Sequence, residues 1–252
     1  MKKKALYNIL SILIWILLWQ IVAQIIDKPV ILPTPFCTIK AFFSLFSKSD
    51  FYKSIGFTLS GITKGFLLGF VLGIVFAAIS SLNIFLHSLT DIPLRVIKSI
   101  PIASFVILAL LWIHPKNLST LIVVFMVMPG LYSAMYISIK NTDKKLLEMA
   151  EVFRMGRLKK IIYIYLPSSM SSLISSSKTA AGFAFKAGVA AEIIGLIRNS
   201  AGNNIYLAKL YLDTPALFAW TIVLVLLSVV FEKLILFVLK LIAKKTGGTA
   251  ND

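Results

Sequence analysis

Three observations predict an all-α integral membrane protein. Hydrophobic residues make up 58% of the 252 residues, and the mean hydropathy is +0.90. Charged residues make up 14%, whereas a soluble domain carries about 25%. The apolar residues also fall into about six runs, each long enough to cross a bilayer as a helix of roughly 20 residues. We therefore expect one transmembrane domain over residues 1–252, with no separate soluble domain.

The hydropathy pattern assigns the spans in order along the chain. They cover residues 6–26, 55–80, 96–113, 118–139, 169–196 and 214–240. An even number of spans puts both termini on one side of the membrane. When both termini are placed in the cytoplasm, the inner segments carry clearly more Lys and Arg than the outer ones, as the positive-inside rule requires. Arg95 and Lys98 then lie in the cytoplasmic segment at the start of the third span.

A short helix is predicted on the outer membrane surface between the first two spans, over residues 33–50. Pro33 and Pro35 open this segment. Its aromatic and aliphatic residues recur at helical spacing, at Phe36, Ile39, Phe43 and Phe46.

The second span carries a ridge of small residues. Glycines stand four residues apart, at Gly61, Gly65, Gly69 and Gly73. This spacing predicts close packing against another helix. The alternative is a surface on which two bundles slide during transport.

The fifth span combines small residues with charges. Its small-residue ridge leads to Glu192, and a carboxylate in hydrocarbon must be paired, hydrated or protonated. Lys178 and Lys186 share another face of this helix, eight residues apart. We assign Lys178, Lys186 and Glu192 to the translocation pathway or its gate, with Glu192 holding an outer gate shut. The alternative is that each pairs with a neighbouring helix.

Residues 141–167 form a charged segment that must lie in water between the fourth and fifth spans. Four apolar residues recur within it at helical spacing, at Leu146, Met149, Ala150 and Phe153. They predict a short amphipathic helix over residues 143–156, capped by Asn141, Thr142 or Asp143. The apolar stripe of such a helix needs another protein surface to pack on.

This segment resembles the EAA signature of permease subunits in binding-protein-dependent ABC importers. That signature reads Glu-Ala-Ala, then Gly four residues after the last Ala, then Ile-x-Leu-Pro ten residues further. The matching residues here are Glu148, Met149, Ala150, Arg154, Ile164, Leu166 and Pro167. Arg154 replaces the glycine, and Gly156, two residues further on, is an alternative residue for the same turn. Leu32-Pro33-Thr34-Pro35 is similar to the nitrate, sulfonate and taurine group, and the resemblance runs over about residues 30–240.

The resemblance implies a permease in the bacterial cytoplasmic membrane, most simply a homodimer with a second copy. It implies ABC ATPase subunits, which bind ATP and Mg²⁺, and an extracytoplasmic solute-binding protein. The substrate would be a sulfonate, taurine or nitrate, or alternatively a heterocycle like a thiamine precursor. The ATPase-coupling surface would comprise Leu146, Glu148, Met149, Ala150, Phe153, Arg154, Gly156, Ile164, Leu166 and Pro167.

We expect no catalysis, metal or cofactor in this chain. Cys37 is the only cysteine, and His87 and His114 stand far apart, so neither a metal cluster nor a Ser/His/Asp set is available. The net charge of +16 follows from basic residues at span ends and in loops, and does not indicate nucleic-acid binding. Two alternatives are an ion-coupled secondary transporter, which would show inverted repeats, and a membrane-embedded transferase, which would show clustered acids or histidines.

Overall fold

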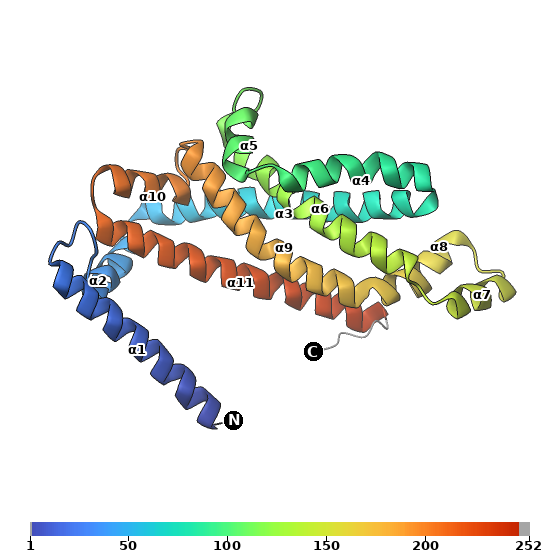
Figure 1. Cartoon of the computed structure of the whole chain (residues 1–252), viewed down its shortest axis with the longest axis horizontal. Coiled ribbons are helices and arrows are strands. Elements are labelled where there is room, and N and C mark those ends of the chain that lie inside the picture. The colour runs from blue at the N-terminus through green and yellow to red at the C-terminus, as the bar shows by residue number, and fades with distance from the viewer. Residues whose placement is uncertain (1, 247–252) are drawn as a thin grey trace.

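The computed structural model describes residues 2–246, so Met1 and residues 247–252 of the predicted domain lie outside the described residues. Within the described range every regular element is a helix (Figure 1). Four long helices run along the bundle, namely α3 (Ser49–Leu82), α6 (Pro115–Lys140), α9 (Leu166–Ile194) and α11 (Thr214–Thr246). The short helices α2 (Pro35–Leu45) and α10 (Ala201–Leu210) lie at one end. The short helices α7 (Lys144–Val152) and α8 (Arg157–Lys160) lie at the other end.

Among the described residues, four helices are long and apolar enough to cross a membrane: α1 (Lys2–Ile26), α3, α6 and α11. Helices α4 (Ile84–Ser99) and α5 (Ile102–Ala109) are each too short to cross a membrane alone and count as a fifth span only when taken together; they meet at an angle of 105°. The chain is therefore an all-α membrane protein with four or five spans by this measure, where hydropathy alone predicted about six.

The predicted third span over residues 96–113 is not one straight helix. It breaks at Ile100, whose backbone is extended (φ −74°, ψ 127°). Pro101 explains the break, because proline disfavours a helical conformation in the preceding residue and has no N–H to donate. As a consequence, Arg95 and Lys98 lie inside helix α4 and not in a loop.

Helix α9 corresponds to the predicted fifth span and has the required length, but its serines and lysines make it less apolar than the four spans above. Its place in the bundle explains this composition. It runs between α6 and α11 (Figure 1), and its buried side includes Ser169, Ser177, Ala180, Ala184 and Gly188. A helix packed against two neighbours gains more on its buried side from small residues, which let those neighbours approach, than from apolar bulk.

The glycine ridge of α3 faces α6 at very close range. A Cβ atom added at Gly65 would lie 2.6 Å from the Thr120 carbonyl oxygen, and one at Gly73 would lie 2.9 Å from the Met128 carbonyl oxygen. Gly61 is looser, with 3.7 Å to its nearest neighbour. The contacts advance along both helices in the same direction, so α3 and α6 are parallel. The bent pair α4 and α5 returns the chain between them.

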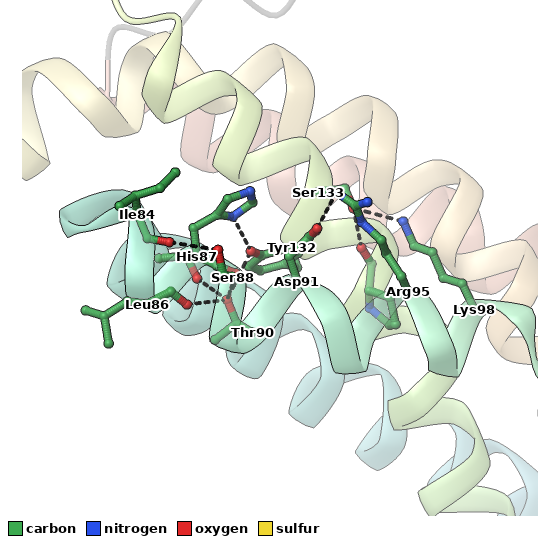
Figure 2. A network of polar contacts seen from close by, with 12 residues as sticks. Ile84, Leu86, His87, Ser88, Thr90, Asp91, Arg95, Lys98, Tyr132 and Ser133 are labelled. Atoms are coloured by element: carbon green, nitrogen blue, oxygen red, sulfur yellow. Dashed lines mark hydrogen bonds and ion pairs between the residues drawn. The ribbon is translucent and has the colours of Figure 1, made fainter.

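Polar contacts fasten α4 along α6 (Figure 2). The hydroxyl of Tyr132, which is buried, lies 3.0 Å from His87 Nδ1 and 3.1 Å from Thr90 Oγ1. Further along, Lys98 Nζ donates to Ser133 Oγ at 2.8 Å. His87 is thus part of the helix contact.

Helix α2 matches the short surface helix predicted over residues 33–50. Thr34 caps its first turn, with Oγ1 accepting from the Cys37 N–H at 3.3 Å. The predicted apolar stripe is exposed, at Phe36, Ile39, Phe43 and Phe46. Helix α1 leaves the bundle (Figure 1), and Trp19 attaches its end by donating from Nε1 to the Pro33 carbonyl at 3.0 Å.

Candidate coupling surface and membrane-embedded charges

Helix α7 stands at the end of the bundle opposite α2 and α10 (Figure 1). Asp143 caps it, because its Oδ1 accepts from the Lys145 N–H at 2.9 Å. Of the three candidate caps predicted from the sequence, Asp143 is therefore the one used. The helix lies in the predicted amphipathic segment and is followed by the short helix α8.

Most of the predicted coupling residues are uncovered. The exposed members are Leu146, Glu148, Met149, Phe153, Arg154 and Gly156. Phe153 has 72% of its surface exposed, and the nearby Val152 and Leu158 expose 80% and 75%. Sequence reasoning did not single out Val152 and Leu158, although Val152 follows Met149 by three residues and so continues the same stripe. A run of exposed apolar side chains on a charged segment is typical of a surface that contacts a protein or a membrane.

Four predicted coupling residues do not belong to this exposed surface. Ala150 and Ile164 are buried, and Leu166 and Pro167 are half-buried. Their assignment to the coupling surface stays a prediction, in which they support the exposed side chains from beneath. An amphipathic helix has to lie on its own chain as well as on a partner, and the side of α7 with Ala150 makes the inner contact. Ile164 and Leu166 belong to the π-helix Ile161–Tyr165 (η1) and the first turn of α9, which join this segment to the bundle.

The turn after α7 is made by Arg154, which adopts a left-handed backbone with φ 48°. The Met155 N–H donates to the Ala150 carbonyl at 2.8 Å, and the Arg154 N–H donates to the Glu151 carbonyl at 2.9 Å. These two bonds are those of a Schellman motif, whose left-handed position usually holds glycine. The alternative that Gly156 supplies the turn is wrong, since Gly156 has φ −63°. Arg154 takes the conformation of the glycine that it replaces.

This geometry predicts opposite behaviour for two substitutions. Arg154→Gly should stabilise the turn by about 1 kcal/mol, because a side chain in the left-handed region costs roughly that much. Gly156→Ala should be neutral, since its φ is ordinary and no atom lies within 4 Å of the added Cβ. Limited proteolysis of the purified protein at the α7 turn measures the effect. Faster cleavage of Arg154→Gly, or of Gly156→Ala, would contradict the assignment of the turn.

Glu192 is fully buried and joins three helices. Its Oε2 accepts from Thr58 Oγ1 of α3 at 2.9 Å and from the Gly202 N–H of α10 at 3.1 Å. Thr58 Oγ1 in turn accepts from the Ala201 N–H at 3.0 Å. Two free N–H groups at the start of α10 are thereby satisfied, and the carboxylate meets the positive end of that helix. A Cβ at Gly202 would lie 2.5 Å from Glu192 Cβ, so only glycine permits this approach.

Two substitutions separate the charge of Glu192 from its hydrogen bonds. Glu192→Gln keeps one acceptor and should cost about 1 kcal/mol of stability through the lost charge at the helix terminus. Glu192→Ala should cost about 2–3 kcal/mol, since it leaves the Thr58 hydroxyl and the Gly202 N–H without their acceptor. Thermal unfolding in detergent should rank wild type, Gln and Ala in that order. An unchanged melting temperature in the Ala variant would show that this contact does not stabilise the fold.

The gate hypothesis for Glu192 stays a prediction. If Glu192 holds an outer gate, Glu192→Gln should make ATP hydrolysis by the assembled transporter less dependent on the loaded binding protein.

The two lysines assigned with Glu192 differ from it in burial. Lys178 and Lys186 are exposed on the bundle surface. Lys186 Nζ lies 5.9 Å from the centre of the Phe183 ring and borders a cavity of about 550 Å³ between α9 and α11. Sequence reasoning also passed over Lys64, which is exposed near the middle of α3. A lysine within an apolar run was the signal that could have found it.

Comparison with known proteins gives two findings. The family model described as "Binding-protein-dependent transport system inner membrane component" matches residues 66–247, well over half of the chain. The putative aliphatic sulfonates transport permease protein SsuC of Bacillus subtilis (strain 168) is 22% identical over 197 residues, covering 77% of this chain and 70% of that protein. The family is one of transport permeases and not of enzymes. The chain therefore belongs to the binding-protein-dependent transport system inner membrane components, as a permease subunit of an ABC importer.

Proposed function

We propose that this permease subunit pairs with a second copy to form an uptake pathway for a small organic sulfonate. Two kinds of partner complete the system: ABC ATPase subunits, which carry the ATP and Mg²⁺, and an extracytoplasmic binding protein that delivers the substrate. Family membership supports partners of these kinds in general. The name of the Bacillus relative supports the sulfonate. The ATP-driven importer is also favoured over the ion-coupled transporter and the transferase.

The main support for the proposed coupling role is the exposed apolar surface on α7 and on the turn after it. Met149, Val152 and Phe153 are exposed within the described chain, at 46%, 80% and 72% of their surface, although they stand on a charged segment. A groove on each ATPase would cover them. Closure of the ATPases around ATP would then draw the two α7 helices together and switch the pathway from inward to outward facing.

The proposed orientation places the α7 end of the bundle in the bacterial cytoplasm. Basic residues gather around this end, at Lys140, Lys144, Lys145, Arg154, Arg157, Lys159 and Lys160. The last turns of α11 lie there too, with Leu239 in the same apolar cluster as Met170 of α9 (Figure 1). Both termini are then cytoplasmic, and α2 lies on the outer surface.

Thiol labelling tests this orientation. Cys37 is exposed on α2, so a membrane-impermeant maleimide should label it in whole cells. In a Cys37→Ser background, Lys159→Cys should react only after the membrane is opened. The reverse pattern would place α7 outside and remove it from any cytoplasmic ATPase.

Reconstitution tests the substrate. The permease, its ATPase and its binding protein are placed in liposomes containing ATP, and uptake of labelled ethanesulfonate, taurine, nitrate and a thiamine-precursor pyrimidine is compared. We expect ATP-dependent uptake of the sulfonates. Uptake of the pyrimidine alone would support the heterocycle alternative and overturn the sulfonate assignment.

A further inference from the structure

A cavity of about 540 Å³, open to the surface of the bundle, lies where α4, α6 and α9 meet. Small residues in the lining leave room for the cavity. Gly130 of α6 has no atom within 4 Å of an added Cβ, and Ala180 of α9 also lines the cavity. The cavity has the size of ordinary small-molecule sites, which run from about 300 to 1,000 Å³. Its lining is mainly apolar, with aromatic rings such as Phe125 and Phe183. None of the residues first assigned to the pathway lines it.

Lys98 supplies the only charge in this lining. The break before Pro101 ends α4 at Ser99, so Lys98 stands on the last turn of the helix, where it is exposed beside α6. Its ammonium donates to Ser133 Oγ at 2.8 Å (Figure 2). No ion pair found among residues 2–246 includes Lys98, and the nearby Asp91 pairs with Arg95. A cation in a mainly apolar cavity without an acidic partner favours an anion.

Two hydroxyl groups of α9 complete the polar side of the cavity. Ser176 and Thr179 both line it, three residues apart and therefore on one face of the helix. Ser176 donates to the Leu173 carbonyl at 3.2 Å, and Thr179 is exposed. The lining thus offers an ammonium and two hydroxyls against apolar walls. A sulfonate head with a short alkyl tail has the matching chemistry, because its oxygens accept hydrogen bonds and its carbons prefer apolar contact.

We propose that this open pocket on the permease bundle is a binding site for small alkanesulfonates, in which Lys98 contacts the sulfonate group. The inference rests on the proposed function, since it gives the sulfonate a place on its way through the protein. It also adds Lys98 to the lysines assigned to the pathway.

Cysteine labelling tests the site without requiring transport. Thr179→Cys is made in a Cys37→Ser background, and the assembled, detergent-solubilised transporter is treated with two methanethiosulfonates. One reagent carries an ethylsulfonate group and the other an ethyltrimethylammonium group. The ratio of anion to cation labelling rates is compared with that of the native Cys37, which is exposed at the far end of the bundle. We expect this ratio to be about five- to tenfold higher at Thr179→Cys, as one nearby unit charge would give.

Substitutions of Lys98 test whether this lysine causes the preference for the anionic reagent. Lys98→Met should bring the ratio down to the Cys37 value, and Lys98→Arg should keep it. Lys64→Met is the matched control: Lys64 is also exposed within a span, but it borders a separate cavity whose α6 residues lie on the other side of that helix. That variant should leave the ratio unchanged. Added ethanesulfonate should slow labelling only where Lys98 or Arg is present.

Two outcomes would overturn the site. One is an unchanged ratio in Lys98→Met, and the other is equal protection by ethanesulfonate with and without a cation at position 98. Failure of the proposed function looks different, because the wild-type transporter would then take up no sulfonate in liposomes, whatever the labelling ratio.

Discussion

Gly65→Ala should strongly destabilise this permease. The added methyl group would lie 2.6 Å from the Thr120 carbonyl oxygen and 2.7 Å from Val123 Cβ, and a backbone oxygen cannot move without displacing α6. Overpacking of this kind costs about 1–3 kcal/mol, and we expect the upper part of that range. Heating the detergent-solubilised protein and measuring the monodisperse fraction by size exclusion should show a clear loss.

Gly61→Ala is the matched control on the same ridge. Its methyl group would lie 3.7 Å from Thr120 Oγ1, which is an ordinary contact, and alanine favours a helix over glycine by up to about 1 kcal/mol. This variant should be as stable as wild type or slightly more so. A Gly65→Ala protein that folds normally but no longer transports would instead support the sliding surface.

Phe153→Asp should uncouple the transporter. The aromatic ring is 72% exposed on the proposed docking surface, so aspartate there should not disturb the bundle but should place a charge in the contact with the ATPase. Central aromatic residues of an interface often contribute about 2 kcal/mol or more, which corresponds to roughly a thirtyfold loss of affinity. Co-purification of the ATPase and ATP-driven uptake should fall together.

Phe36→Asp serves as the control for this variant. Phe36 is 75% exposed on α2, at the other end of the bundle, so the two changes remove similar side chains with similar exposure. ATPase binding should survive Phe36→Asp. Normal ATPase binding by Phe153→Asp would remove the proposed interface.

Local patterns in the sequence were enough to predict several elements. The stripe at Phe36 and Phe43 predicted α2, and the charged segment that begins near Asp143 predicted α7. In these cases one short run of residues determines both the helix and its face.

Where the fold depends on distant residues, the sequence was less informative. Hydropathy does not distinguish a straight span from the bent pair α4 and α5, because both are apolar. The apolar stripe of α7 also could not reveal that Ala150 packs on its own chain while Met149 stays uncovered. The partners of Glu192 come from elsewhere, since Thr58 is 134 residues away along the chain.

Arg154 represents a third kind of case. Its left-handed backbone is fixed by the two hydrogen bonds that close α7, and no propensity of arginine indicates it. Only the position of glycine in the related signature pointed to this residue.

Site-specific photocrosslinking tests the central claim most directly, namely that α7 is where this permease meets its ATPase. A photoreactive benzoyl-phenylalanine is placed at Phe153 or, for comparison, at Phe36, and the assembled transporter is irradiated. We predict an ATPase adduct from position 153 and none from position 36. An ATPase adduct from position 36, or none from position 153 in a transporter that still takes up substrate, would contradict the account.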